Sequence, residues 1–464
     1  MTSYAAYGSW VERLEAIAVG REVLAVAGRR DVLGTVAPSS VHVVPTSLLE
    51  GKGRPWQLEA GGAIRALAFA GDDLLIGGGD DGALIAWDVT GKVRVAQLAL
   101  GAAIQAIALD GGVAHGDGVI AVGTADGALH LVRSVIANAT PAWTVAARHA
   151  LSEGALGALA WDPAGLWLAG GADGQLWVIG SGAPRAVSPG GDGGIRAIVS
   201  LGDGRAAIGC GDGGVRLCYV VGDVEATDRS GDHGHQAAVR GLVLGPAVTD
   251  DAGRELPRRL FSAGEDGAIK AWLVDGNRRP RTIELGIGPA SALAFAPGSV
   301  VKPVAVDKAV GRLWIASTER NVAALALGPE VEPVGEPVVL GSTLGAIAGL
   351  LRDGKAAVKV KLEMLDALAG LAEDEARALL DLALASGPPE VRIAATRAMV
   401  RSGRKASRPA LRAALDAEPK DLRIAAFTAL RALETEQPLA AVRAGLAVRH
   451  EDIRIAAVEA LIPL

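Results

Sequence analysis

The sequence of 464 residues has few cysteines, few aromatic side chains and no long apolar run. Its two cysteines, Cys210 and Cys218, form no CxxC pair and lack metal-site spacing. This excludes a disulfide-rich fold and a fold stabilised by a structural zinc site. They flank a predicted tight turn, where we expect two buried free thiols, with a disulfide as the alternative. No run of about 18 apolar residues occurs, so the sequence predicts no membrane span.

The aromatic content is nine Trp, three Tyr and four Phe, although half of the residues are apolar. Any core must therefore consist mainly of small and branched aliphatic side chains. Residues 1–19 lack the charged start and apolar stretch of a signal peptide, which favours a cytoplasmic protein. The net charge of −6 argues against nucleic acid as the main partner.

Catalytic signatures are also absent from the sequence. It contains no GxxxxGK(S/T), no HExxH, no GxSxG and no GxGxxG between a strand and a helix. The seven histidines are dispersed, and His233 and His235 have no further Cys or His beside them to complete a metal site. We therefore predict no enzymatic activity, no cofactor and no metal.

A repeated unit dominates residues 1–340. An apolar strand is followed by a second strand that ends in small residues, an Asp-Gly turn and a third strand. Because Gly accepts φ > 0 and Asp bonds its own backbone, Asp-Gly between apolar runs is typical of a tight hairpin. The five turns are Asp81-Gly82, Asp126-Gly127, Asp173-Gly174, Asp212-Gly213 and Asp266-Gly267.

Two weaker copies, in residues 14–44 and 290–327, have the same strand pattern without the Asp-Gly turn. Short strands at this spacing are what four-stranded propeller blades require. Seven copies predict a seven-bladed β-propeller of four-stranded antiparallel blades, which we number blades 1 to 7 along the chain.

The propeller repeats resemble the WD-repeat family. Trp87-Asp88 ends a third strand, and Gly234-His235 precedes a first strand. Blades of that family contain a hydrogen-bonded Asp–His–Ser–Trp tetrad, and blade 6 has all four residues at the matching positions: His235, Ser262, Asp266 and Trp272. The resemblance implies that these side chains satisfy one another's buried polar groups. Blade 2 retains only the Asp and the Trp, and the other blades keep little beyond the turn.

The composition changes after about residue 341 to an Ala-, Leu- and Arg-rich helical pattern. Arg392, Arg423 and Arg454 recur every 31 residues, each with an acid two residues before it, where a carboxylate stabilises a helix N-terminus. Partner helices fit between these copies, and a weaker copy covers Val358–Leu368. The sequence thus predicts two domains, 1–340 and 341–464, and a β + α multidomain fold.

Two helices per repeat of about 31 residues resemble the short HEAT repeat, which implies an α-solenoid of about four helical pairs. In that family the acid and the Arg often bond from one repeat to the next, which Asp421, Arg423, Asp452 and Arg454 are placed to do. Isolated surface ion pairs are the alternative. Because the last copy lacks a polar cap, we expect the stack to continue beyond Leu464.

Two groups of polar side chains are candidate binding sites. The second residue of the innermost strand is Arg65, Gln105, Arg196 or Arg240 in four blades, and propeller symmetry places these around one mouth of the central channel. Guanidinium groups there suit an acidic peptide or a phosphate, and a solvated lining is the alternative.

The second group is a cluster of arginines in two loops on one face of blade 6. It contains Arg254, Arg258, Arg259, Arg278, Arg279 and Arg281. This cluster predicts a partner surface, a docking site for the protein's own helices, or a solvated loop balanced by nearby acids.

Together these features favour a non-catalytic scaffold for protein–protein interaction, with other proteins as partners. The Ala-, Gly- and Arg-rich, Lys-poor composition indicates a subunit or regulatory module of a bacterial multi-protein assembly. Two alternatives stay open: a coat-like trafficking scaffold, and a sensor module whose channel mouth binds an acidic peptide or a phosphorylated ligand. The sequence indicates no oligomeric state.

Overall fold

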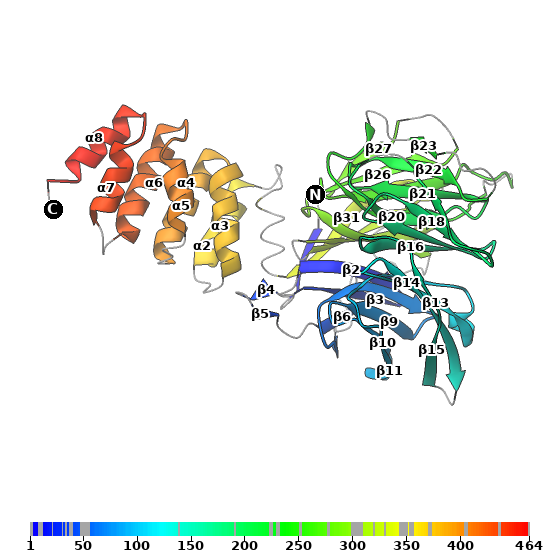
Figure 1. Ribbon diagram of the computed structural model, residues 1–464. Helices are drawn as coiled ribbons and strands as arrows, with labels where there is room; N and C mark the ends of the chain where they lie inside the picture. Colours follow the sequence, from blue (N-terminus) through cyan, green and yellow to red (C-terminus); the bar gives the residue numbers. More distant parts are fainter. Residues whose placement is uncertain are drawn as a thin grey trace. The chain divides into compact units, whose positions relative to one another are not determined.

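The computed structural model describes residues 3–7, 13–20, 22–29, 31–32, 35–36, 40–46, 56–137, 140–189, 192–221, 226–228, 233–249, 253–275, 279–297, 310–318, 321–328, 331–342, 351, 357–369, 374–402, 407–434 and 438–462. The chain divides into two compact units, with the boundary between Ser342 and Thr343. The first unit is built of strands and the second of helices (Figure 1).

The first unit consists of seven blades, each formed by consecutive strands of the chain. Blade 1 contains β2 (Arg13–Val19), β3 (Val23–Arg29), β6 (Ser40–Pro45) and β7 (Trp56–Glu59). Blade 2 contains β8 (Ile64–Ala70), β9 (Leu74–Gly79), β10 (Ala83–Asp88) and β11 (Val93–Ala99). Blade 3 contains β12 (Ile104–Leu109), β13 (Asp117–Thr124), β14 (Ala128–Ala137) and β15 (Thr140–Ala150). Blade 4 contains β16 (Leu156–Asp162), β17 (Leu166–Gly171), β18 (Leu176–Ile179) and β19 (Arg185–Val187).

The remaining three blades follow the same order. Blade 5 contains β20 (Ile195–Ser200), β21 (Arg205–Cys210), β22 (Val215–Tyr219) and β23 (Ala226–Asp228). Blade 6 contains β24 (Val239–Leu244), β25 (Arg259–Gly264), β26 (Ala268–Leu273) and β27 (Arg281–Glu284). Blade 7 contains β28 (Ala290–Pro297), β29 (Gly311–Ser317), β30 (Asn321–Leu327) and β31 (Pro333–Ser342). A small hairpin of β4 (Asp31–Val32) and β5 (Thr35–Val36) is inserted in blade 1, and a short 3-10 helix, η2 (Val113–His115), in blade 3.

The innermost strands of neighbouring blades pack side by side around the whole circle. Strand β2 of blade 1 packs against β8 on one side and against β28 of blade 7 on the other, which closes the ring. The strands within each blade are antiparallel, apart from one addition to blade 7. The predicted seven-bladed propeller of antiparallel blades is therefore confirmed.

The addition is β1 (Ser3–Tyr7), which the repeats do not predict. This strand pairs in parallel with β31, the outer strand of blade 7, from Ser3 opposite Val338 to Tyr7 opposite Ser342. Blade 7 is therefore a five-stranded sheet, in which the two ends of the propeller sequence meet.

The five predicted Asp-Gly turns connect the second and third strands of blades 2 to 6. Each Gly has a positive φ, between 69° at Gly82 and 86° at Gly213. In each turn the Asp side chain accepts a hydrogen bond from the backbone N–H two residues later, at 3.0 Å in the Asp81 turn and 2.9 Å in the Asp212 turn. Asp and Gly therefore have complementary roles, because one supplies the acceptor and the other the left-handed backbone.

Small residues near the end of each second strand allow the blades to approach closely. A Cβ atom at Gly78, Gly170 or Gly209 would lie 2.4–2.6 Å from the first residue of the next blade's inner strand. Those facing residues are the buried Ile104, Ile195 and Val239. The inter-blade core thus consists of branched aliphatic side chains packed directly on backbone, as the scarcity of aromatics requires.

Among the described residues of the second unit there are seven helices (Figure 1): α2 (Val358–Ala369), α3 (Asp374–Ser386), α4 (Pro389–Arg401), α5 (Arg408–Ala414), α6 (Lys420–Leu433), α7 (Pro438–Leu446) and α8 (Glu451–Glu459). The three aligned sequence segments form α4, α6 and α8, and the weaker copy forms α2. These helices pack in that order, and α3, α5 and α7 pair with α4, α6 and α8. One continuous apolar core joins them, from Leu365 in α2 to Ile453 in α8.

Candidate functional site

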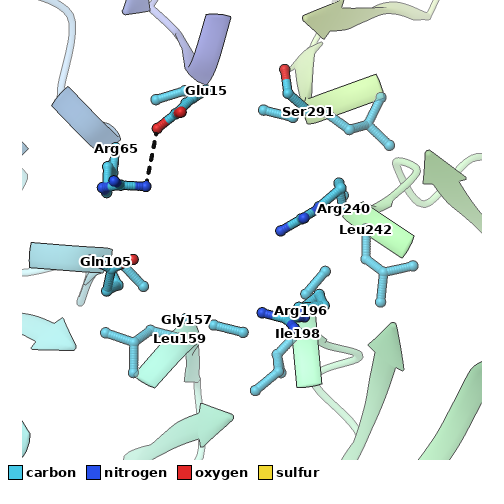
Figure 2. A pocket seen from close by; sticks show the side chains of 18 of the residues that line it. Glu15, Arg65, Gln105, Gly157, Leu159, Arg196, Ile198, Arg240, Leu242 and Ser291 are labelled. Atoms are coloured by element: carbon cyan, nitrogen blue, oxygen red, sulfur yellow. Dashed lines mark hydrogen bonds and ion pairs between the residues drawn. The ribbon is translucent and has the colours of Figure 1, made fainter. Parts of the chain in front are cut away.

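A ring of seven residues, one from each blade, surrounds one mouth of the propeller channel. Each innermost strand has a β-bulge near its start, at the third residue of β2 and at the second residue of the other six, so that this residue has no partner on the neighbouring strand. In chain order the seven bulged residues are Glu15, Arg65, Gln105, Gly157, Arg196, Arg240 and Ser291. All seven line a central cavity of about 510 Å³ (Figure 2). Bulges redirect side chains out of the regular pleat, which here turns them toward the channel.

The four residues proposed from the sequence, Arg65, Gln105, Arg196 and Arg240, all lie in this ring. Sequence reasoning missed Glu15, Gly157 and Ser291, which occupy the same place in blades 1, 4 and 7. A usable signal existed, because one four-residue pattern lies at or near the start of the seven inner strands: LEAI, IRAL, IQAI, LGAL, IRAI, VRGL and ASAL. The third residue is always small and the fourth is always Ile or Leu, so the varying second residue stands out.

A second ring of aliphatic side chains lies next to the polar one. It consists of the fourth residues of the same segments: Ile17, Leu67, Ile107, Leu159, Ile198, Leu242 and Leu293. Figure 2 shows Leu159, Ile198 and Leu242 beside the polar ring. The cavity thus combines a charged rim with an aliphatic wall, which suits a ligand that has both a charged group and an apolar group.

Two of the three ring arginines already bind carboxylates of the protein. Arg65 forms an ion pair with Asp80 and a second one with Glu15, at 3.3 Å between Nη1 and Oε2. The hydrogen bond to Asp80 raises the pKa of Arg65 above its ordinary value. Arg240 donates from Nε to Glu265 Oε1 at 2.7 Å. These carboxylates offset the positive charge of the guanidinium groups on the part of the ring formed by blades 1, 2 and 6.

Arg196 differs from the other two because no acceptor pairs with it among the described residues. It is exposed and projects into the opening (Figure 2). The adjoining lining comes from Ala155, Gly157 and Ala172 of blade 4, and no heavy atom lies within 4 Å of the position of a Cβ at Gly157. Blade 5 therefore presents a free guanidinium next to an open, uncharged sector of the rim.

The tetrad residues of blade 6 form one hydrogen-bonded chain. His235 Nδ1 lies 2.9 Å from Asp266 Oδ1, and His235 Nε2 lies 2.7 Å from Ser262 Oγ. Trp272 Nε1 donates to the same Ser262 Oγ at 2.8 Å. Burial lowers the pKa of His235, so its neutral form donates from Nδ1 to Asp266 and accepts the Ser262 hydroxyl proton at Nε2. Every polar group of the set then has a partner.

In blade 2 the indole N–H of the Trp has a different hydrogen-bond acceptor. Trp87 Nε1 donates to the backbone carbonyl of Glu59 at 3.0 Å. A Cβ at Gly77, the place of the Ser, would lie 2.8 Å from Leu67 and 3.0 Å from the Trp87 ring. The indole and a leucine therefore fill the space that a tetrad hydroxyl would need.

The arginine cluster of blade 6 lies at the opposite end of its strands from the Arg240 rim. Arg258 donates to the backbone carbonyl of Leu201 in blade 5, and Arg259 and Arg281 both bind Glu332 of blade 7. Arg254 and Arg279 are exposed, and Arg278 lies outside the described residues. Three of these arginines thus connect blade 6 to its two neighbours.

Among the described residues of the helical unit, the predicted bond between repeats forms once. Arg423 of α6 donates from Nη2 to Asp452 of α8 at 2.7 Å. This bond lowers the pKa of Asp452. Arg392 instead donates to the carbonyl of Leu384 at 2.7 Å, and Arg454 donates to the carbonyls of Val448 and Arg449.

The other chemistry-bearing groups are buried or scattered. The two cysteines are free and buried, as the sequence predicts, and burial raises the pKa of Cys218 to about 12. The described ranges contain no cluster of three or more His, Cys, Asp or Glu side chains able to hold a metal ion. Within the same ranges, no helix has both the length and the apolarity needed to cross a bilayer.

The two repeat arrays are similar to different known proteins. Residues 376–462 match the family model of HEAT repeats. The propeller is similar to Sqt1 from Chaetomium thermophilum, at 16% identity and a TM-score of 0.52, over 71% of this chain and 87% of that one. Sqt1 bound to the N-terminus of ribosomal protein L10 gives the same identity and TM-score, over 70% and 88%.

The WD40 propeller domain of Doa1 is also similar, at 14% identity and a TM-score of 0.48, over 68% of this chain and 93% of that one. No curated protein sequence matches the chain. The HEAT family model and the similarity to Sqt1 agree with a β-propeller followed by HEAT-type helical pairs.

Proposed function

We propose that this protein is a non-catalytic scaffold of WD-repeat type whose propeller binds an acidic segment of a partner protein at the channel mouth. The observation that carries the proposal is Arg196, an exposed guanidinium without a carboxylate partner among the described residues. Such a group binds carboxylates through charge-assisted, bidentate hydrogen bonds. Arg65 and Arg240 are already engaged, so Arg196 is the ring position left for a ligand.

The shape of the cavity favours a peptide with two neighbouring features. A Glu or Asp carboxylate would bind Arg196, with the amide of Gln105 within the same ring as a further donor. An adjacent aliphatic side chain would pack against the second ring, which includes Leu159 and Ile198. A volume of about 510 Å³ lies in the range of ordinary ligand sites, so one or two side chains fill it.

Two further observations support a protein-binding propeller of this type. The complete tetrad of blade 6 is the feature expected of WD repeats. The similar propeller of Sqt1 is known in complex with a segment of ribosomal protein L10. A cytoplasmic location and a place in a bacterial assembly stay predictions that rest on composition.

Fluorescence polarisation with labelled six-residue peptides tests the proposal. The peptides share a central pair in which the first residue is Glu, Gln or phosphoserine and the second is Leu. We expect the Glu peptide to bind at least tenfold more tightly than the Gln peptide, and Arg196→Gln to abolish that preference. Arg65→Gln is the matched control and should retain most of it, because Arg65 is already bound to Asp80 and Glu15.

A second pair of variants tests the location. Gly157→Leu fills the open sector beside Arg196 and should block binding, whereas Gly182→Leu, at an equally open glycine in the β18–β19 turn, should not. Equal binding of the Glu and Gln peptides, or unchanged affinity in Arg196→Gln, would contradict the proposal. Tighter binding of the phosphoserine peptide alone would favour the phosphorylated-ligand alternative.

A further inference from the structure

The residue that precedes the Asp of an Asp-Gly turn can lie beside the ring residue of its own blade. In blade 2 this residue is Asp80, and it forms an ion pair with the ring residue Arg65. In blade 6 it is Glu265, which forms an ion pair with the ring residue Arg240. The same contact thus occurs in two blades that are not neighbours, so the residue before the turn determines whether the ring arginine is neutralised.

Blade 5 has no room for such a pair. Gly211 precedes the Asp of its turn, and a Cβ atom there would lie 2.7 Å from the carbonyl carbon of Gly193. The backbone N–H of Gly211 donates to the carbonyl of Gly194 at 2.9 Å, which holds the two segments together. Any side chain at Gly211 therefore collides with backbone, and Arg196 keeps its positive charge within its own blade.

Glu265 occupies one side of the Arg240 guanidinium. Arg240 Nε and Nη2 lie 2.7 and 2.5 Å from the same oxygen, Glu265 Oε1. The backbone N–H of Glu265 donates to the carbonyl of Ala238 at 2.9 Å, and the side chain is 37% exposed and lines the cavity. The inner strands of blades 5 and 6 pack against each other, and Arg196 and Arg240 both project into the opening (Figure 2). Arg240 is therefore the ring arginine next to Arg196, and Glu265 holds it.

From these contacts we propose that Glu265 determines which anion the channel mouth binds. It keeps Arg240 from a phosphate group, so the site selects a segment with a single carboxylate over a phosphorylated one. This role of Glu265 rests on the proposed function, in which Arg196 binds an acidic side chain of a partner. A phosphoserine carries about 1.5–2 negative charges and three acceptor oxygens, which proteins bind with clusters of arginines. A Glu carboxylate carries one charge, and Arg196 alone suffices for it.

The variant Glu265→Gln tests the proposal with the labelled Glu and phosphoserine peptides of the preceding experiment. The Gln side chain keeps the length of Glu265 but lacks its charge, so Arg240 becomes available to a phosphate. In the parent chain we expect the phosphoserine peptide to bind no more tightly than the Glu peptide. In Glu265→Gln we expect the phosphoserine affinity to rise about tenfold and the Glu affinity to change by less than about threefold.

Two further variants show whether the released Arg240 is responsible. Asp80→Asn removes a carboxylate from the same place in blade 2, but Arg65 keeps its ion pair with Glu15, so the phosphoserine affinity should change by less than about threefold. Arg240→Gln combined with Glu265→Gln should lose most of the gain in phosphoserine affinity. The melting temperature of each variant, followed by tryptophan fluorescence, checks that the propeller is folded.

The results distinguish the role of Glu265 from that of Arg196. Failure of the Glu peptide to bind the parent chain contradicts the proposed function. If the Glu peptide binds as expected, an unchanged ratio of the two affinities in Glu265→Gln would overturn the role of Glu265 alone. A phosphoserine peptide that already binds the parent chain about tenfold more tightly than the Glu peptide would also overturn it. So would a gain in phosphoserine affinity that survives in the double variant.

Discussion

The propeller and the helical array differ in which positions of their repeats keep the same residue. In the inner strands of the propeller, the small third residue and the aliphatic fourth residue recur, whereas the second residue changes from blade to blade. In α4, α6 and α8 of the helical array, the acid and the arginine recur together with the apolar residues. In the propeller the variable position faces the channel, and in the helical array one recurring arginine, Arg423, binds the recurring acid of the next repeat, Asp452.

The two arrays also differ in architecture, because the blades form a closed ring and the helical repeats do not. Every blade of the ring has two neighbours, so the variable second residue and the aliphatic fourth residue meet a ligand at the channel mouth. In the helical array, α8 packs against α6 and α7, and within the described part of the chain its residues Arg454 and Val458 are exposed.

The largest expected effect concerns two equivalent positions of successive repeats, one buried and one exposed. Phe427→Ala should lower the free energy of unfolding of the helical unit by about 3–5 kcal/mol, because it removes a buried ring and leaves a cavity. Val458→Ala, at the equivalent exposed position, should change it by less than about 0.5 kcal/mol. Urea unfolding followed by helical circular dichroism measures both, and similar losses would mean that the α8 face is covered.

Acid should destabilise the ring in a way that depends on a buried histidine. Burial lowers the pKa of His42 in blade 1 to about 4, below its ordinary value of 6.5. The unfolded chain therefore binds a proton between pH 6.5 and 4 that the folded propeller does not, and stability falls as the pH falls through this range. The loss should reach about 3 kcal/mol at pH 4.

His42→Gln removes this titrating group and should flatten the pH dependence over the same range. Tryptophan fluorescence follows the propeller alone, because all nine tryptophans precede residue 342. An identical pH profile in His42→Gln and the parent chain would refute this assignment.

A smaller effect compares the bonded arginine with its unbonded equivalent. Arg423→Ala should cost about 1–3 kcal/mol, since it leaves the half-buried Asp452 without its partner. Arg454→Ala loses the same kind of backbone contacts but no ion pair, and should cost less than about 0.5 kcal/mol. A double-mutant cycle with Asp452→Asn isolates the coupling, and a coupling near zero would show that the bond between repeats contributes no stability.

The smallest expected effect concerns the ring position that varies. Arg196→Gln should leave the propeller's free energy of unfolding within about 0.5 kcal/mol of the parent value, because the side chain is exposed and unpaired among the described residues. Arg65→Gln should cost up to about 1 kcal/mol through loss of two partly exposed ion pairs. A clear loss of stability in Arg196→Gln would indicate a structural contact and weaken its assignment as the ligand-binding arginine.

Much of the fold could be predicted because its signals are local. An Asp-Gly turn needs only the conformational freedom of Gly and the reach of the Asp side chain, so the hairpins at Asp81 and Asp266 could be predicted from adjacent residues. Four of the five charged or amide residues of the ring were found through their position in the repeat, whereas Glu15 was missed in blade 1, which has no Asp-Gly turn to align it. Gly157 and Ser291 were missed because they have little chemistry of their own, although the empty space at Gly157 helps to define the site.

Contacts between distant residues could not be predicted in the same way. Nothing near Arg240 in the sequence indicates that Glu265, 25 residues later, binds it, or that Arg196 lacks such a partner. The parallel pairing of β1 with β31 joins residues about 335 positions apart and leaves no repeat pattern. For the blade 6 arginines, the sequence shows a cluster of charge, and only the fold shows that Arg259 and Arg281 share Glu332.

The sequence by itself determined the two repeat arrays, the number of blades and the residue that varies at the channel mouth. Periodic apolar patterns and turn residues act over a few positions, so they are readable without a structure. Only the tertiary structure decided which arginines are neutralised and which faces are covered. Those properties depend on carboxylates and helices brought together from distant parts of the chain, which is why Arg196 and Arg454 are distinguishable from Arg65 and Arg423 only in the folded protein.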